Sequence, residues 1–402
     1  MLIKFFKILK KSNFKFSNPK NTDILIFDDE SSDLIENLLS SFKYYTLKTR
    51  PEKIDCLYIT LKVIFLSFFY YRGNILSSYL ISIISIINPK VVITYIDNSL
   101  KFSELALRFK KIDKRIKFIA VQNGSRYEIL ENEFLFKNNV IKENINKKFY
   151  IPTFLTFGKY EKQIYKKLKI KVIKIQPVGS LKLEKYNEYK RKNKIKIKKK
   201  KQLCLLSDHG AWQSKINKID DNIEKNFISL TNFCIKFSKK YNYKIKICEK
   251  RMKDKNLDNK KIFETDYFLE KKAFKKYLNP KHYSYFKKSL LKRDKNIFKT
   301  YLNMEESEVL ISTMSTMLRE NLFLGNKILA ANLTGNSIYN FPIKGFFSFN
   351  DNCYEKFEKR LLSIIKMSNE TYFKKIGKNT DYCIIKNNSP SKKIISVIKS
   401  CL

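Results

Sequence analysis

The feature that most constrains the fold is the alternation of short apolar runs with helix-like stretches. In the first half of the chain the apolar runs, each followed by a polar or glycine-containing turn, are 24–27, 56–60, 91–96, 117–121, 153–157 and 173–178. A run such as VVITYI is apolar at consecutive positions, which is typical of strands that are covered on both faces. Strands that alternate with helices form parallel sheets. The first half is therefore predicted to be a doubly wound α/β domain.

The same alternation restarts in the second half, with apolar runs at 203–206 and 243–247. Residues 309–331 then follow the order strand, Ser/Thr-rich turn, helix, glycine stop and strand, which is typical of one βαβ unit. Two terminal helices are expected at about 353–367 and 391–401. The chain is therefore predicted to have an α/β fold with two Rossmann-like, doubly wound parallel-sheet domains that face a cleft.

Length and local composition set the expected domain boundaries. A chain of 402 residues should form two domains, because single cores usually stop growing near ~250 residues. Residues 182–201 are rich in Lys and lack apolar periodicity, which favours an exposed basic linker over the sharper alternative of a nucleic-acid patch. Irregular structure is expected over 254–303. The predicted parts are an N-terminal domain at 1–181, the linker at 182–201, a C-terminal domain at 202–380 and a closing helix at 381–402.

The charge balance is strongly basic, with 82 Lys and Arg against 38 Asp and Glu, for a net charge of +44. The excess is mostly Lys and accompanies abundant Asn, Ile, Phe and Tyr, a joint bias typical of an AT-rich coding background. Part of the positive charge is attributed to this compositional bias. The rest creates a positive field that should attract anionic lipid headgroups or phosphorylated substrates. No nucleic-acid-binding motif with interleaved aromatic residues is present, so specific nucleic-acid binding is not predicted.

Cysteine usage and hydropathy indicate the compartment. The seven cysteines form no CxxC pair, which favours reduced thiols in the cytoplasm, and with two histidines a zinc site is not expected. The basic N-terminal stretch 1–11 lacks the features of a signal peptide. The apolar region 57–87 is interrupted by Lys62 and by Arg72, so its pieces fall short of the ~20 residues that span a bilayer. Peripheral attachment to a membrane surface is expected instead.

In open α/β sheets, ligands bind beyond the carboxyl ends of the strands, so the residues that follow the apolar runs are the site candidates. In the first half these candidates are Asp97, Asn98, Gln122, Asn123, Gly124 and Arg126. In the second half they are His209, Lys250, Arg251, Ser315, Thr316 and Glu320.

Each group of candidates has a chemical use and a structural alternative. A carboxylate such as Asp97 can act as a general base, and hydroxyls at a helix start suit a phosphate because unpaired N–H groups and the helix dipole favour negative charge. Lys250 and Arg251 could add cations to such a site. The alternatives are a helix cap at Ser315, ordinary turns at the Asp-Asn and Asn-Gly pairs, and solvated cations.

Three segments carry a family resemblance: 91–126, 312–328 and 341–347. They resemble bacterial surface-carbohydrate (lipopolysaccharide or O-antigen) biosynthesis proteins, which are similar to glycosyltransferases of the GT-B fold. The resemblance covers about residues 90–347 and departs from the family pattern at Met317-Leu318-Arg319. The residues that match the motifs of that family are Asp97, Asn98, Gln122, Asn123, Gly124, Arg126, Ser315, Thr316, Glu320, Gly325 and Lys327.

The resemblance implies a glycosyltransferase that moves a sugar from a nucleotide-sugar donor to a lipid-linked or surface-glycan acceptor. It implies a donor bound mainly by the C-terminal domain, an acceptor bound by the N-terminal domain, no metal, and no cofactor apart from the donor substrate. In these roles Asp97 is the expected general base with His209 in reserve, the diphosphate lies near Ser315 and Thr316, and Glu320 holds the ribose. We expect the protein at the inner, anionic face of the cytoplasmic membrane.

Other functions remain open from the sequence. On the same fold, a polyol-phosphate polymer transferase or a sugar-nucleotide epimerase would need similar groups. A basic nucleic-acid-binding protein and a catalytically silent scaffold for glycan assembly are alternatives of other classes.

Overall fold

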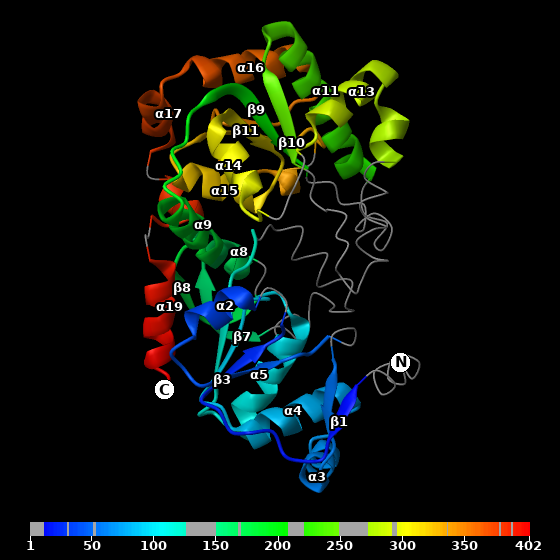
Figure 1. Ribbon diagram of the computed structural model, residues 1–402, viewed down its shortest axis with the longest axis vertical. Helices are drawn as coiled ribbons and strands as arrows, with labels where there is room; N and C mark the ends of the chain where they lie inside the picture. The colour runs from blue at the N-terminus through cyan, green and yellow to red at the C-terminus, as the bar shows by residue number, and fades with distance from the viewer. Residues whose placement is uncertain are drawn as a thin grey trace. The chain divides into compact units, whose positions relative to one another are not determined.

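The computed structural model describes residues 12–29, 32–50, 54–125, 150–167, 170–207, 221–248, 272–291, 296–335, 337–377, 379–386 and 389–402. These residues form two compact units (Figure 1). The described residues of 12–124, 150–184 and 389–402 make up the first unit, and residues 125 and 185–386 make up the second.

The first unit is built on a six-stranded parallel sheet with the strand order β3-β2-β5-β6-β7-β8. Its strands are β2 (Ile24–Phe27), β3 (Tyr44–Leu47), β5 (Val91–Thr94), β6 (Lys117–Val121), β7 (Tyr150–Thr156) and β8 (Lys171–Pro177). A separate pair of short parallel strands joins β1 (Asn13–Lys15) to β4 (Cys56–Tyr58).

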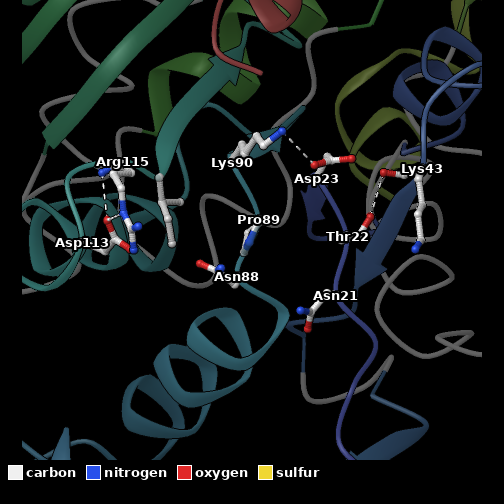
Figure 2. A pocket seen from close by; sticks show the side chains of 10 residues that line it. Asn21, Thr22, Asp23, Lys43, Asn88, Pro89, Lys90, Asp113 and Arg115 are labelled. Atoms are coloured by element: carbon white, nitrogen blue, oxygen red, sulfur yellow. Dashed lines mark hydrogen bonds and ion pairs between the residues drawn. The ribbon is translucent and has the colours of Figure 1, made fainter.

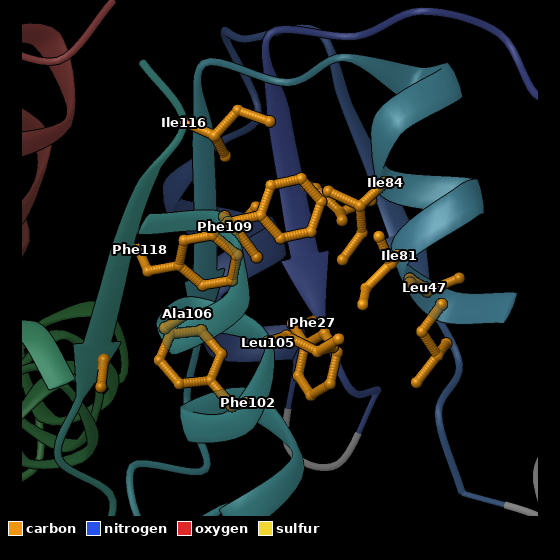
Figure 3. Packing of buried hydrophobic residues seen from close by; sticks show 14 of the residues in the cluster. Phe27, Leu47, Ile81, Ile84, Phe102, Leu105, Ala106, Phe109, Ile116 and Phe118 are labelled. Carbon is orange, nitrogen blue, oxygen red and sulfur yellow. The ribbon is translucent and has the colours of Figure 1, made fainter. Parts of the chain in front are cut away.

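Helices cover both faces of this sheet. They are α2 (Asp33–Leu38), α3 (Leu61–Phe69), α4 (Ile75–Ile87), α5 (Leu100–Ile112), α8 (Tyr160–Lys167) and α19 (Pro390–Lys399), with α9 (Leu181–Lys192) leading into the second unit. Side chains alternate along each strand, so Leu25 and Phe27 enter one apolar cluster while Ile24 and Ile26 enter the other. Figure 3 shows the first cluster, where Phe102 of α5 packs between strand and helix residues.

The second cluster contains the C-terminal helix. Ile394, Val397 and Ile398 of α19 pack with Ile24 and Ile26 of β2, although almost the whole chain separates them in sequence. The last helix therefore completes the apolar layer of the unit that contains the first strands.

The second unit has a five-stranded parallel sheet with the order β10-β9-β11-β12-β13. Its strands are β9 (Lys200–Leu206), β10 (Lys244–Cys248), β11 (Ser307–Ser312), β12 (Lys327–Ala331) and β13 (Ser348–Phe349). Its helices are α11 (Asp221–Tyr241), α13 (Pro280–Ser289), α14 (Lys299–Glu306), α15 (Thr316–Phe323), α16 (Tyr354–Lys366), α17 (Asn369–Ile376) and α18 (Asn379–Cys383), and one 3₁₀ turn, η2, spans Ser337–Tyr339.

The two parallel sheets confirm the predicted α/β class, and the structure refines several local expectations. The run at 56–60 supplies β4, which pairs with β1 and lies outside the main sheet. The region expected to be irregular, 254–303, contains α13 and the start of α14, so that expectation is wrong there. The stretch 182–201 holds most of α9, which spans the boundary between the two units, and the start of β9. Among the described helices, none is both long and apolar enough to cross a membrane.

The aromatic centre of the first cluster allows a test of the packing. Phe102 is fully buried, with its ring centroid 5.7 Å from that of Phe27 and 5.4 Å from that of Phe118. We expect Phe102→Ala to lower the free energy of unfolding by about 3–5 kcal/mol, because it removes apolar contacts and leaves a cavity. Chemical denaturation measures this change. The matched control is Phe16→Ala, at a side chain that is 78% exposed, and equal effects of the two substitutions would contradict the packing.

Candidate functional site

The predicted residues Asp97 and Asn123 come together at the carboxyl ends of β5 and β6. These strands are neighbours in the sheet, so the turns that follow them start side by side. Asp97 is 1% exposed, and its Oδ1 accepts a hydrogen bond of 3.1 Å from the backbone N–H of Asn123. Asn98 lies half-buried in the same turn, directly before Ser99, which caps α5. The carboxylate therefore orders the loop after β6 as well as occupying the strand end.

Gln122 has a positioning role that the sequence did not reveal. Its Oε1 accepts from the N–H of Phe157 at 2.7 Å, and its Nε2 donates to the carbonyl of Gly124 and to Oε1 of Glu161, both at 2.8 Å. Every polar atom of the amide thus bonds to protein, and the side chain is 1% exposed. Glu161 is fully buried in the first turn of α8, where a helix N-terminus favours a carboxylate.

A hollow of about 450 Å³ lies at the amino ends of the strands of the same sheet (Figure 2). Its lining residues precede the strands: Asp23 comes before β2, Lys43 before β3 and Lys90 before β5. Lys90 forms an ion pair with Asp23 at 3.3 Å. This hollow is therefore distinct from the strand-end candidates, which follow the carboxyl ends.

In the second unit, 309–331 has the βαβ arrangement predicted from the sequence. Strand β11 leads to α15, Gly325 ends the helix with φ +76°, and β12 pairs in parallel with β11. Ser315 is the N-cap, and its Oγ accepts from the N–H of Met317 at 3.3 Å. Oγ1 of Thr316 accepts from the N–H of Ser125 at 2.7 Å. A hydroxyl that accepts one bond still has an O–H to donate, so capping and anion binding are compatible for these side chains.

Glu320 lies one turn into α15 and is 2% exposed. Its Oε2 accepts a hydrogen bond of 2.7 Å from the hydroxyl of Tyr301 on α14. The ring of Tyr301 stacks on that of Tyr186 at 4.8 Å, and Tyr186 donates its hydroxyl to Glu305. Burial and this hydrogen bond raise the pKa of Tyr186. A buried polar and aromatic network thus holds the carboxylate of Glu320 in place.

The structure explains two unusual features of this segment. Leu318 and Arg319, which depart from the family pattern, are fully buried, so their side chains pack inside the unit. The ammonium of Lys327 donates hydrogen bonds to the carbonyls of Ile365, at 3.1 Å, and of Met367, so it caps the C-terminal end of α16. Burial lowers the pKa of Lys327. The Lys of the Gly-x-Lys motif therefore has a structural role here.

Asn226 of α11 is a polar residue that the sequence did not single out. Its Nδ2 donates to Oγ1 of Thr313 at 2.9 Å, and its Oδ1 accepts from the N–H of Leu333 at 2.5 Å. One buried amide therefore ties together the ends of β11 and β12. The Ser/Thr-rich sequence after β11 signalled this region, but nothing in the sequence around 226 did.

Four predicted site residues, His209, Lys250, Arg251 and Arg126, lie outside the described residues. The other candidates form two groups. One group lies at the carboxyl ends of β5 and β6 and contains Asp97, Asn98, Gln122, Asn123 and Gly124. The other lies on α15 and at its N-cap and contains Ser315, Thr316 and Glu320. Within the described ranges, no three His, Cys, Asp or Glu side chains are grouped as a metal site would require.

Comparisons with known proteins identify the fold. No protein-family model matches the sequence, and no curated protein matches it significantly. Among solved structures, wall teichoic acid polymerase TagF aligns with 99% of this chain and 92% of its own, at 11% identity and a TM-score of 0.52. UDP-GlcNAc 2-epimerase from Neisseria meningitidis, bound to UDP-GlcNAc, covers 94% of this chain and 99% of its own, at 12% identity and a TM-score of 0.51.

A third similar structure is the UDP-forming α,α-trehalose-phosphate synthase from Burkholderia vietnamiensis. It covers 94% of this chain and 100% of its own, at 7% identity and a TM-score of 0.50. With these likenesses and its two parallel-sheet units, the chain has a GT-B-like fold.

The Gln122 network predicts a specific pH response. Gln122→Glu replaces a donor with an oxygen that faces the carboxylate of Glu161 and the carbonyl of Gly124. We expect the free energy of unfolding at pH 7 to fall by about 3 kcal/mol or more. Like charge and burial raise the pKa of the introduced carboxyl above its unfolded value, so the deficit should shrink as the pH falls towards about 5.

Chemical denaturation of both proteins across this pH range measures the effect. Gln163→Glu makes the same chemical change at an exposed position on α8 and should show neither the loss nor the recovery. A deficit of Gln122→Glu that stays constant with pH would contradict the arrangement.

Proposed function

We propose that the protein is a glycosyltransferase that moves a sugar from a nucleotide-sugar donor to a lipid-linked or surface-glycan acceptor. The observation that carries this proposal is the β11–α15–β12 unit, where a hydroxyl-bearing helix start precedes a buried carboxylate held one turn further on. The unit lies in a fold shared with an epimerase solved with UDP-GlcNAc and with a UDP-forming synthase. The biological product would be a bacterial surface polysaccharide such as lipopolysaccharide or O-antigen.

In the proposed reaction, the bond from the anomeric carbon to the diphosphate breaks and a bond to the acceptor oxygen forms. Asp97 takes the proton that the acceptor hydroxyl loses, with His209 as the alternative base. The leaving nucleoside diphosphate gains charge, which the hydroxyls of Ser315 and Thr316, the start of α15 and the cations Lys250 and Arg251 offset. Glu320 accepts hydrogen bonds from the ribose. The reaction as proposed needs no metal, and it takes place at the inner face of the cytoplasmic membrane.

A polymerase that transfers polyol phosphate is the second candidate. The TagF structure favours it, because the alignment covers 99% of this chain. Product analysis separates the candidates: a new glycosidic bond supports the glycosyltransferase, a phosphodiester-linked polyol supports the polymerase, and an epimerised free sugar nucleotide supports an epimerase. Tight nucleic-acid binding that weakens steeply with salt, without turnover of any sugar nucleotide, would favour the basic nucleic-acid-binding alternative.

Asp97→Asn tests the proposed base with a side chain of the same shape. The new amide oxygen can still accept from the N–H of Asn123, and chemical denaturation of the variant measures any change in the free energy of unfolding. Turnover should fall by about 10²- to 10⁴-fold, because an amide cannot take the acceptor proton. Transfer from a panel of UDP- and CDP-linked sugars to membrane extract provides the assay. Unchanged turnover with unchanged stability would leave Asp97 a loop-ordering role alone.

Glu320→Gln tests the proposed ribose contact. The amide oxygen can still accept from Tyr301, but the charge is lost, so nucleotide affinity should fall about tenfold to a hundredfold. Titration calorimetry with the nucleoside diphosphates measures this. Glu355→Gln, an exposed substitution in the first turn of α16, is the matched control. Equal affinities for the two variants would remove Glu320 from the nucleotide site.

A further inference from the structure

Helix α3 carries large apolar side chains on the face that it exposes to solvent. Leu61, Phe65 and Phe68, spaced i, i+4 and i+7, lie on one side of the helix and are 88%, 70% and 78% exposed. Ile64 and Phe69 flank this row and are also exposed. A surface helix of a soluble domain normally presents polar residues there, so α3 departs from the usual amphipathic pattern.

The opposite face of α3 is firmly attached to the first unit. Val63 is buried, and Leu66 and Tyr70 pack against the apolar cluster that contains α4 and α5. Oγ of Ser67 donates to Oγ of Ser82 on α4 at 3.1 Å, and Thr60 caps the helix by accepting from the N–H of Val63. The exposed row therefore belongs to a well-anchored helix with an apolar face on each side.

Neighbouring segments extend this surface. The strand β1 lies next to the start of α3, because the N–H of Ile59 donates to the carbonyl of Lys15 at 2.8 Å and Thr60 donates to Asn18 at 2.7 Å. Figure 1 shows β1, α3 and α4 at one end of the first unit. We call the following exposed apolar residues the α3 patch: Phe14, Phe16, Leu61, Ile64, Phe65, Phe68, Phe69, Tyr71 and Ile75.

Charges around the α3 patch are all positive within its own stretch of chain. The sequence has no Asp or Glu between Asp55 and Asp97, whereas Lys62 and Arg72 are exposed among the patch residues. Lys15 lies between Phe14 and Phe16 in the sequence. The nearby carboxylates Asp55 and Glu104 are paired with Lys48 and Lys101. Exposed cations among apolar residues match a bilayer with anionic headgroups, where aromatic side chains enter the interface and cations remain among the phosphates.

We infer that the α3 patch docks on an anionic lipid bilayer, with α3 lying in the plane of the interface. Exposed apolar side chains concentrated on one helix and the segments beside it mark an interaction site, and the cations among them favour an anionic membrane over a neutral one. The inference rests on the proposed function in one respect: docking would hold the first unit, which is expected to bind the acceptor, at the membrane surface where a lipid-linked acceptor resides. Docking itself requires neither nucleotide nor turnover, so the two proposals can fail separately.

Vesicle binding by the full chain tests the assignment. The probes are vesicles of phosphatidylcholine alone and of phosphatidylcholine with phosphatidylglycerol, and binding is measured by flotation. We expect strong binding to the anionic vesicles. The double substitution Phe65→Ser and Phe68→Ser should weaken binding to anionic vesicles at least about a hundredfold. Each phenylalanine that no longer enters the bilayer should account for about tenfold of this loss. Lys62→Gln and Arg72→Gln should each weaken binding to anionic vesicles about fivefold and leave binding to neutral vesicles unchanged.

Ile297→Ser in the second unit is the matched control, because Ile297 is as exposed as Phe68, at 78%, and lies outside the α3 patch. It should bind like the unsubstituted chain. Phe68→Trp offers an independent readout, since brominated lipids should quench its added fluorescence if the side chain enters the bilayer. Vesicle binding that survives the double Phe substitution would overturn the assignment. So would a dimer that the double substitution converts to monomer while vesicle binding stays unchanged, because the patch would then join two copies.

Discussion

Both units depend on the same constraint: a parallel strand needs apolar neighbours on both of its faces. In the first unit, successive residues of β2 enter opposite clusters, one formed with α4 and α5 and the other with α2 and α19. Strands built in this way expose little polar surface along their length, so polar chemistry collects where they end. The candidate residues Asp97, Gln122 and Asn123 all lie at such ends.

At these ends, individual polar side chains hold the loops in place as well as offering groups to a ligand. Asp97 orders the loop after β6, Asn226 joins the loops after β11 and β12, and the Tyr301 hydroxyl fixes the Glu320 carboxylate. Such preorganisation is what an enzyme site needs, because a group held in position before the reaction requires no rearrangement during it. A purely structural reading of each residue and a catalytic one are therefore compatible rather than exclusive.

Local patterns in the sequence predicted much of this architecture. Consecutive apolar residues located the main strands, and Ser315 and Gly325 marked the two ends of α15. Contacts between distant residues were not predictable in this way. No local signal connects Gln122 with Glu161 or Tyr301 with Tyr186, and the pairing of β1 with β4 depends on which segments meet in space. The sequence located the apolar region at 57–87 but did not show that α3 within it has only one of its faces covered.

The placement of α19 sets an order of events during synthesis. Every described strand of the second unit has been made once Phe349 is reached, whereas one face of the first sheet still lacks Ile394, Val397 and Ile398 at that point. The part of the protein that is translated first therefore completes its core last. Until then, the apolar surface of β2 and β5 that α19 covers stays open to water, and a nascent chain has to avoid aggregating through it.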